Sequence, residues 1–272
     1  MKFLCKLYKI PRSSYYKYKN RIKPQKEIQD ELLCQLINEY HLTYDQTLGY
    51  RQMRIFINKL NHKNYCNNYI YRLMKYSGIK SRIRRKKVNR KKVKPDYIAE
   101  NILNRDFSAS RPNEKWLTDV TEFKIPNSTK KLFLSPILDL YDRSIITYEL
   151  SYRNNNNIVF KMFNKAVKAN PSAKPTFHSD RGFQYTGRQF KHKLDSHGMR
   201  QSMSRPGKCI DNGPMEGFFG ILKSEIFHGK KFESYDELEK KIEEFINYYN
   251  NGRFQAKLKN MSPIEYRTHA FI

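Results

Sequence analysis

The fold is decided by residues 116–151, WLTDVTEFKIPNSTKKLFLSPILDLYDRSIITYELS. Three runs in this stretch are rich in β-branched and aromatic residues, which favour strands, and they cover Trp116–Ile125, Leu132–Leu140 and Ser144–Ser151. Turn-forming pairs separate the runs, Asn127-Ser128 after the first and Asp142-Arg143 after the second. Runs joined by such short turns predict three consecutive antiparallel strands.

Helix and strand alternate after these strands. A helix is expected at 157–169, a strand at Thr176–Ser179, a helix at 187–197 and a short strand at 200–203. Two further helices follow, one capped by Asn212 and running to about Phe227, the other opened by a capping box of Ser234 and Glu237 and running to about Asn250. The alternation indicates crossovers onto a mixed sheet, and the whole order resembles the ribonuclease-H-like fold.

Three short helices are predicted in the N-terminal third of the chain. Apolar residues recur at helical spacing in 28–40, 48–61 and 67–77, and Gly78 would end the last helix. The apolar face of the second helix is expected to consist of Met53, Phe56, Ile57 and Leu60. Short helices with surplus Arg and Lys suggest a helix-turn-helix, although such triplets also occur in proteins that never touch DNA.

The net charge of +27, from 53 basic and 26 acidic side chains, exceeds what solubility needs and suits a polyanion such as nucleic acid. Residues 1–100 hold 25 basic and 7 acidic side chains, whereas residues 101–272 hold 28 and 19. A genome rich in A and T would also raise the Lys content, but it does not explain this clustering. The N-terminal part is therefore expected to be the main electrostatic anchor.

The densest charge lies at 80–94, KSRIRRKKVNRKKVK, where ten of fifteen side chains are basic. These like charges repel one another, which opposes folding of the segment on its own, and they are suited to binding phosphates. A linker is therefore favoured over a merely solvated tail. The expected division is a helix-turn-helix-like region at 1–79, a basic linker at 80–111 and a catalytic domain at 112–272. The candidate DNA contacts in the first two parts are Arg51, Arg72, Arg84, Arg85, Lys86 and Lys87.

Several classes of protein are disfavoured. The sequence has no run of 18 apolar residues and no signal-peptide core, so a cytoplasmic location without a membrane partner is expected. The four cysteines are widely spaced and form no CxxC pair, which argues against a disulfide framework. Cys34, His41, His62 and Cys66 match no common zinc pattern, so no structural zinc is predicted.

Three acidic residues lie at positions where a catalytic or metal-binding role is plausible. Asp119 interrupts an apolar predicted strand, Asp180 follows the predicted strand Thr176–Ser179, and Glu216 lies in the first turn of a predicted helix. Taken singly, Asp180 is equally well a turn former and Glu216 an acid that suits the helix dipole. Taken together, they supply the hard oxygen ligands that two Mg²⁺ ions about 3.5–4 Å apart need for phosphoryl transfer.

The spacing of these acids is specific. Thirty-five residues separate Asp180 from Glu216, and Lys223 follows Glu216 by seven positions, two helical turns later on the same face. This resembles the D,D-35-E motif, with its trailing basic residue, of retroviral integrases and insertion-sequence transposases. The segments WLTDVTEF, HSDRGFQY and DNGPMEGFFGILKSE resemble the catalytic segments of the IS-three family, and LGYRQMRIFI, YRLMKYSGIKSR, YYNNGRFQAKL and SPIEYR resemble its helix-turn-helix and closing segments.

The resemblance implies a fold and a reaction. The fold would be α/β, with the ribonuclease-H-like mixed sheet of an integrase catalytic core flanked by helices, after a small all-α helix-turn-helix-like domain. The chain would be the downstream, catalytic frame of a transposase encoded in two overlapping frames. It would cut DNA at the element's ends and direct the 3′-OH onto DNA, typically through a circular intermediate.

The resemblance also implies ligands and partners. Asp119, Asp180 and Glu216 would hold two Mg²⁺ ions, with Mn²⁺ able to substitute, and Lys223 would contact DNA near the scissile bond unless it is an ordinary solvated lysine. The implied partners are terminal inverted repeats, target DNA, further copies of the chain, and an upstream-frame partner or fusion.

Neighbouring residues have two interpretations each. His178 shares a strand face with Asp180 and either orients a nucleophile or phosphate or makes a structural hydrogen bond. Asn212 is expected to cap its helix and, secondarily, to stabilise the adjacent loop. Arg181, Tyr185 and Arg205 are candidate DNA contacts.

A nuclease that only hydrolyses and a non-catalytic DNA-binding protein are the alternative functions to a transposase. Joining of a 3′-OH end to DNA separates the transposase from both.

Overall fold

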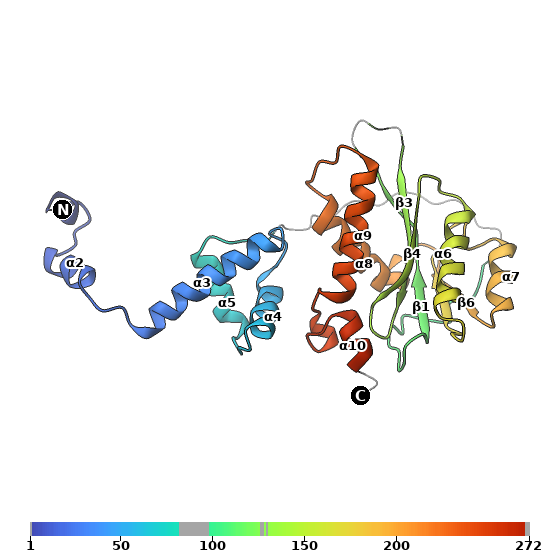
Figure 1. Ribbon diagram of the computed structural model, residues 1–272, viewed down its shortest axis with the longest axis horizontal. Coiled ribbons are helices and arrows are strands. Elements are labelled where there is room, and N and C mark those ends of the chain that lie inside the picture. The colour runs from blue at the N-terminus through green and yellow to red at the C-terminus, as the bar shows by residue number, and fades with distance from the viewer. Residues whose placement is uncertain (1, 82–97, 126–127, 129, 270–272) are drawn as a thin grey trace. The chain divides into compact units, whose positions relative to one another are not determined.

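The computed structural model describes residues 2–81, 98–125, 128 and 130–269. The chain divides into two compact units, Met1–Ser81 and Arg82–Ile272, and most of their helices and strands are labelled in Figure 1. The expected DNA contacts Arg84, Arg85, Lys86 and Lys87 lie outside the described residues, as does Asn127 of the first expected turn.

The first unit is helical, as the apolar spacing predicts. Its helices are α1 (Lys2–Leu7), α2 (Arg12–Lys19), α3 (Gln25–Thr43), α4 (Tyr50–Leu60) and α5 (Asn67–Tyr76). The predicted helices correspond to α3, α4 and α5, which bury Ile37, Met53 and Ile70 against one another. Leu60 is the last residue of α4 and is 47% exposed, so the buried part of the predicted apolar face ends at Ile57.

Gly78 ends α5, as predicted. Its φ of +69° lies in the left-handed region that favours glycine. The N–H of Gly78 donates to the carbonyl of Lys75 over 3.2 Å, and the N–H of Ile79 donates to the carbonyl of Met74 over 2.8 Å. These two bonds form a Schellman motif, which satisfies carbonyls that the last turn of a helix leaves open.

The second unit is built on a mixed sheet. Its described strands are β1 (Lys115–Thr118), β2 (Thr121–Phe123), β3 (Leu132–Asp139), β4 (Ile145–Ser151), β5 (Thr176–Ser179) and β6 (Arg200–Met203). β3 pairs antiparallel with β4 on one side and with both β1 and β2 on the other, and β1, β5 and β6 pair in parallel. The predicted antiparallel strands and the predicted crossovers are confirmed.

The first predicted strand is interrupted at Asp119, where the sequence predicted continuity to Ile125. β1 ends at Thr118 and β2 begins at Thr121, and both lie along β3. Pro136 of β3 lies opposite the gap, since Ile137 pairs with Thr118 and Leu134 with Thr121. Proline has no N–H to donate to a neighbouring strand. The gap between β1 and β2 therefore lies where Pro136 already removes a hydrogen bond from the ladder with β3.

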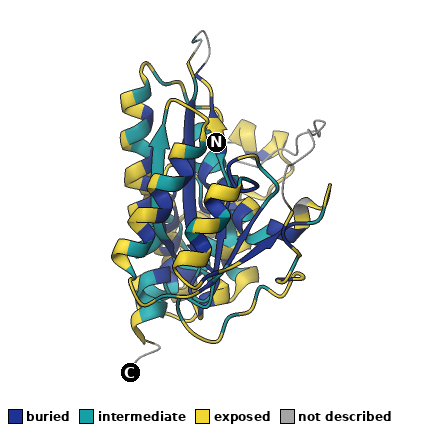
Figure 2. Ribbon diagram, turned by 90° about the vertical axis from the view of Figure 1, so that its right-hand side faces the viewer, coloured by how far each residue is buried: buried dark blue, intermediate teal, exposed yellow. Residues whose placement is uncertain are grey.

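Helices cover both faces of the sheet (Figure 1). They are α6 (Asn156–Ala169) and α7 (Arg188–Ser196) on one face, and α8 (Gly213–Leu222) and α9 (Tyr235–Asn251) on the other, with α10 (Pro263–His269) packed against α9. Trp116, Phe163 and Phe177 belong to the first apolar layer, and Leu117 and Phe218 to the second. The sheet is therefore the buried middle layer, coloured dark blue in Figure 2.

The core of the second unit extends into the segment expected to be linker. Ala99 is 7% exposed and packs with Trp116, and Leu103 is 3% exposed and packs with Leu117. The division at residues 79 and 111 stays a prediction. Among the residues that the structure describes, no helix is long and apolar enough to cross a bilayer.

Candidate active site

Asp119 and Asp180 follow two neighbouring parallel strands. Asp119 comes directly after β1, and Asp180 directly after β5. The two strands pair with Lys115 beside Thr176 and Leu117 beside His178, and the same register continued by two residues aligns Asp119 with Asp180. Neighbouring strands lie about 4.8 Å apart, so both carboxylates leave the sheet at one place on its carboxyl edge.

A buried tyrosine lies beside both carboxylates. Tyr185 is 1% exposed, and its hydroxyl lies 3.1 Å from the hydroxyl of Thr118. Burial raises the pKa of Tyr185 well above its usual value, and the charges of Asp119 and Asp180 raise it further. The charges of Asp119 and Asp180 thus both act on the hydroxyl of Tyr185. Because the ring is enclosed in the core, the expectation that Tyr185 stacks on DNA is wrong.

Gly182 and the side chain of Asp180 are closely packed. The N–H of Gly182 donates to Oδ1 of Asp180 over 2.7 Å. A Cβ at position 182 would lie 2.9 Å from that same oxygen and 2.9 Å from Oε1 of Gln184, closer than real Cβ contacts come. In the sequence, Gly182 is marked only by its place two residues after a candidate ligand, which is a signal for such a role.

Asn212 ties the helix of Glu216 to the end of β1. It is 3% exposed, and its Nδ2 donates to the backbone carbonyl of Thr118 over 3.1 Å. It makes no side-chain capping bond to α8, so the expected cap is wrong and the secondary, loop-stabilising role is the one observed. Its Oδ1 is buried and has no hydrogen-bond partner among the described residues. Glu216 lies in the next turn and is exposed.

The short 3-10 helix before α8, Cys209–Asn212, is held by an ion-pair cluster. The carboxylate of Asp211 is fully buried and accepts from Nε of Arg105 over 2.7 Å and from Nε of Arg205 over 2.8 Å. Hydrogen bonds from Arg205, followed by those from Arg105, hold the pKa of Asp211 well below its usual value. Arg205, considered as a DNA contact, therefore has a structural partner beside the site.

His178 has a structural role. It is fully buried, with Nδ1 2.9 Å from the hydroxyl of Ser202 and Nε2 3.2 Å from the hydroxyl of Ser204. Burial lowers its pKa to about 4, so the ring is neutral at physiological pH. Arg181 donates from Nε to the carbonyl of Ser204 over 2.7 Å, which fixes the same loop. Of the two interpretations of His178, the contacts favour the structural hydrogen bond.

Lys223 follows the last residue of α8. The helix continues from Lys223 to Phe227 as a π-helical turn, so the predicted end near Phe227 is confirmed. Nζ of Lys223 lies 5.1 Å from the ring centroid of Phe123, the last residue of β2. Within the described ranges, no three Asp, Glu, His or Cys side chains converge closely enough to form a metal cage. The sheet thus aligns Asp119 with Asp180. Glu216 lies on α8, whose start is joined to the end of β1 by the bond from Asn212 to Thr118.

The two candidate DNA contacts of the helical unit are exposed and lie on tyrosine rings. Arg51 on α4 lies over Tyr50, with its guanidinium carbon 5.0 Å from the ring centroid. Arg72 on α5 lies 5.3 Å from the ring centroid of Tyr69 and 3.8 Å from Oδ2 of Asp30. Their contacts with DNA stay predictions.

Comparison with known proteins identifies both units. Residues 27–87 match the family model of an HTH-like domain, and residues 109–209 and 216–271 match models of an integrase core domain. An uncharacterized transposase-like protein of Haemophilus influenzae is 44% identical over 212 residues, 78% of this chain and 95% of that protein. The putative transposase InsK for insertion sequence element IS150 of Escherichia coli is 40% identical over 275 residues, 99% of this chain and 94% of that protein.

Among solved structures, the catalytic core domain of HTLV-2 integrase in complex with magnesium matches with a TM-score of 0.44 and 16% identity, covering 58% of this chain and 98% of that one. The two sequence relatives are far more similar, and they cover 78% and 99% of this chain. An HTH-like domain is followed by an integrase core in a chain 40% identical to the IS150 transposase, so the protein belongs to the IS-three family of insertion-sequence transposases, which cleave DNA and transfer its strands.

Proposed function

We propose that Asp119, Asp180 and Glu216 form the active site of this transposase and hold its metal ions. An integrase core implies dependence on a divalent metal, and the donor set here consists of carboxylate oxygens, which Mg²⁺ and Mn²⁺ prefer. The observation that carries the proposal is the parallel register of β1 and β5, which aligns Asp119 with Asp180. A pair of Mg²⁺ ions would stabilise charge on the attacking and leaving oxygens of a phosphodiester.

The chain's own residues position these ligands. The backbone N–H groups of Val120 and Gly182 each donate to a ligand carboxylate over 2.7 Å, to Asp119 and to Asp180 respectively. The bond from Asn212 to Thr118 holds the start of α8, and with it Glu216, beside the end of β1. Ligands held in advance need little reorganisation when substrate arrives. The same site then serves both water and a 3′-OH as nucleophile.

DNA binding belongs to both units in this proposal. The helix-turn-helix would read the terminal inverted repeats, with Arg51 and Arg72 on its surface, and Arg84, Arg85, Lys86 and Lys87 would contact phosphates. Lys223, which lies over the ring of Phe123 on β2, would contact the DNA near the scissile bond, and target DNA would enter at the same edge. Two element ends must meet, so we expect a homo-oligomer on DNA. We also expect an upstream-frame partner or fusion, and action in the cytoplasm.

The test is a cleavage and strand-transfer assay with Mg²⁺ on DNA that carries the element's end. Wild-type chain is compared with Asp119→Asn, Asp180→Asn and Glu216→Gln, and with Glu233→Gln as a matched exposed control. We expect the three variants to bind DNA but to lose cutting and joining by at least about 100-fold, while the control keeps both. Activity of the three variants at the wild-type level would refute the assignment.

The assay also separates the alternatives. A nuclease that only hydrolyses would cut the end without joining it to target DNA, and a non-catalytic DNA-binding protein would do neither. If wild type binds but does not cut, the upstream-frame partner is added, and activity that appears only then assigns the partner a required role.

A further inference from the structure

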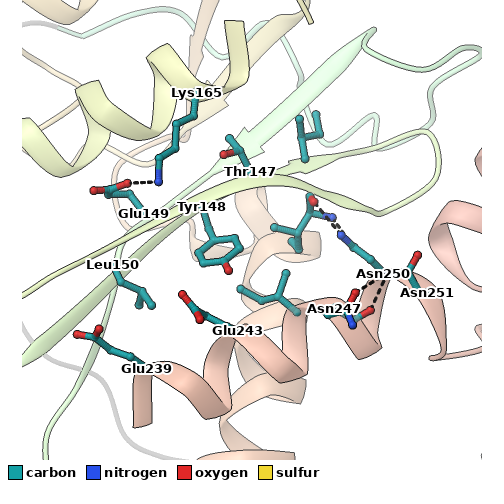
Figure 3. Close-up of a pocket in the computed structure, with 13 residues that line it drawn as sticks. Thr147, Tyr148, Glu149, Leu150, Lys165, Glu239, Glu243, Asn247, Asn250 and Asn251 are labelled. Atoms are coloured by element: carbon teal, nitrogen blue, oxygen red, sulfur yellow. Dashed lines mark hydrogen bonds and ion pairs between the residues drawn. The ribbon is translucent and has the colours of Figure 1, made fainter. Parts of the chain in front are cut away.

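A groove runs along the outer edge of β4. Its volume is about 630 Å³, and it is lined by residues 145–150 of β4, by Lys165 of α6 and by one face of α9. Figure 3 shows Tyr148 on the strand facing Glu243 on the helix, with Glu239 one turn away. Among the described strands, β4 pairs with β3 alone, so it forms an edge of the sheet.

The open edge of β4 offers hydrogen-bonding groups. The carbonyl of Pro136 accepts from the hydroxyl of Thr118, so it faces β1, and Tyr148 is the partner of Pro136 across the ladder. In an antiparallel ladder, such an arrangement turns the N–H and C=O of Tyr148 toward the open side, and those of Leu150 with them. Edge strands are usually protected from pairing by lysine, proline, another charge or a bulge. Ile145–Ser151 contains no lysine or proline, its bulge lies at Ile146, and its one charge, Glu149, is paired with Lys165.

A side chain already occupies one end of this edge as a further strand would. Oδ1 of Asn250 accepts from the N–H of Ile145 over 2.9 Å, and Nδ2 of Asn250 donates to the carbonyl of Ile145 over 2.9 Å. One carboxamide therefore satisfies both backbone groups of Ile145, as a paired residue in an added strand does. The edge beyond it, at Tyr148 and Leu150, leaves room for a polypeptide of a few residues.

The wall of the groove is acidic. Glu239 and Glu243 stand one turn apart on α9, about 6 Å along the helix axis. The negative charge of Glu243 reaches the strand, because together with burial it raises the pKa of Tyr148. On the opposite wall, Nζ of Lys165 lies 2.6 Å from the carboxylate of Glu149, so these two charges offset each other. The net charge of the groove is therefore negative, although the chain as a whole carries +27.

We propose that this groove binds an extended basic segment of a partner protein as an added strand beside β4. Alternate residues of a strand lie about 6.7 Å apart on one face, which matches the spacing of Glu239 and Glu243. Lysine or arginine at alternate positions would pair with these carboxylates while the backbone pairs with Tyr148 and Leu150. DNA is a poor occupant because its phosphates are repelled, and a second copy would bring the same carboxylates to the edge.

The groove is separate from the candidate active site. Strand β3 lies between β4 and the end of β1 that precedes Asp119, and β1 lies further between β4 and Asp180, so a bound segment is at least one strand away from either aspartate. The proposal consequently does not depend on the metal ligands. It assigns the protein a place where a partner can be attached while DNA is cut.

The experiment uses the full chain and a fluorescent peptide of alternating lysine and valine, acetyl-Lys-Val-Lys-Val-Lys-Val-Lys-amide, with binding followed by anisotropy. We expect Glu239→Gln combined with Glu243→Gln to weaken binding about tenfold or more. The matched control combines Glu244→Gln with Asp195→Asn, which changes the net charge equally on exposed residues outside the groove and should alter affinity less than about twofold.

The backbone part of the proposal has its own test. Peptides N-methylated on all valines or on all lysines are compared, because only one set of N–H groups faces β4 in an added strand. We expect N-methylation of one set of residues to abolish binding and N-methylation of the other set to preserve it. Equal effects of the two sets, or equal affinities of the groove and control variants, would overturn the proposal. So would a chain that ignores the peptide and self-associates more strongly when Glu239 and Glu243 are neutralised, since the groove would then join two copies.

Discussion

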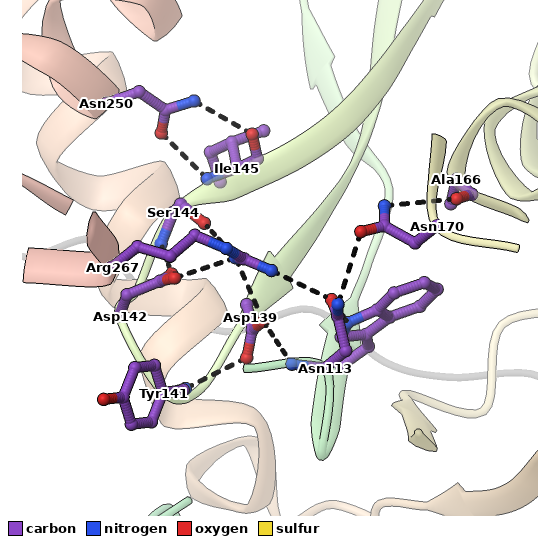
Figure 4. Close-up of polar contacts among 11 residues, drawn as sticks. Asn113, Asp139, Tyr141, Asp142, Ser144, Ile145, Ala166, Asn170, Asn250 and Arg267 are labelled. Atoms are coloured by element: carbon purple, nitrogen blue, oxygen red, sulfur yellow. Dashed lines mark hydrogen bonds and ion pairs between the residues drawn. The ribbon is translucent and has the colours of Figure 1, made fainter. Parts of the chain in front are cut away.

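Arg267, in the last helix, donates to the carboxylate of Asp139 at the end of β3, 128 positions earlier in the chain, over 3.3 Å. The same Nη1 donates to Asp142 over 2.8 Å, and Nη2 donates to Asn113 over 3.2 Å (Figure 4). Asp139 and Asp142 are fully buried. One guanidinium thus joins α10 to the end of the sheet that lies away from Asp119.

Loss of Arg267 should destabilise the fold in a pH-dependent way. Burial and the charge of Asp142 raise the pKa of Asp139 to about 6, whereas Arg267 lowers it. The folded-state pKa lies above the unfolded value of about 3.9, so ionisation of Asp139 costs stability as the pH rises through 6. We expect Arg267→Gln to lower the free energy of unfolding by about 3 kcal/mol at pH 8 and by less at pH 5, where Asp139 is protonated.

Urea unfolding at the two pH values measures this difference. Arg188→Gln, which changes an exposed arginine at the start of α7, is the control and should have little effect at either pH. An equal loss for Arg267→Gln at pH 5 and pH 8 would show that the ionised carboxylate of Asp139 is not what Arg267 compensates.

Asn212→Ala should impair catalysis more than DNA binding. The change removes the hydrogen bond to the buried carbonyl of Thr118, a loss of about 0.5–1.5 kcal/mol, and it releases the start of α8 from β1. We expect strand transfer to fall at least about tenfold while affinity for the element's end stays within about twofold. Asn247→Ala, on an exposed position of α9, serves as the control. Unchanged strand transfer in Asn212→Ala would separate this bond from catalysis.

Gly182→Ala should displace the carboxylate of Asp180. The added Cβ would lie 2.9 Å from Oδ1 of Asp180, so the carboxylate or the backbone must shift. Because a misplacement of about 1 Å can cost about 100-fold in rate, we expect a large loss of cleavage with the fold retained. Gly187→Ala is the matched control, since a Cβ there meets nothing within 4 Å. The measurement is the single-turnover cleavage rate, with circular dichroism to verify folding.

Arg51→Ala should weaken DNA binding without changing the chemical step. If Arg51 contacts a phosphate, its removal lowers affinity for all sequences and reduces the slope of log K against log salt by about 1. Binding at several salt concentrations and the cleavage rate at saturating DNA are the two measurements. Lys168→Ala, on α6 of the other unit, controls for the loss of one positive charge. A slope equal to that of wild type would remove Arg51 from the interface.

Much of the fold follows from local patterns in the sequence. The β-branched and aromatic runs predict β3 and β4 correctly, and helical spacing predicts α3, α4 and α5. The break at Asp119 could not be predicted in this way, because apolar and aromatic residues continue through Phe123 and Ile125. It depends on Pro136, which the fold places opposite the gap from a different strand.

The candidate site was predicted by spacing, but its supports were not. The D,D-35-E spacing selects Asp119, Asp180 and Glu216, yet the alignment of the two aspartates depends on the register between β1 and β5. Local rules made Asn212 a helix cap because Asn is favoured there. The side chain is instead oriented by the bond that its Nδ2 donates to the carbonyl of Thr118, which lies 94 positions earlier in the chain, so only the folded structure brings this partner within reach.

These two long connections, from Asn212 to Thr118 and from Arg267 to Asp139, have a consequence during synthesis on the ribosome. Residues emerge in order, so the DNA-binding helices are complete well before Glu216 and the last helix leave the tunnel. Under the proposed DNA-binding role of the first unit, a nascent or prematurely terminated chain would occupy an element's end without a complete catalytic domain. Such fragments would compete with finished transposase for the same DNA, and errors in translation would restrain the mobility of the element.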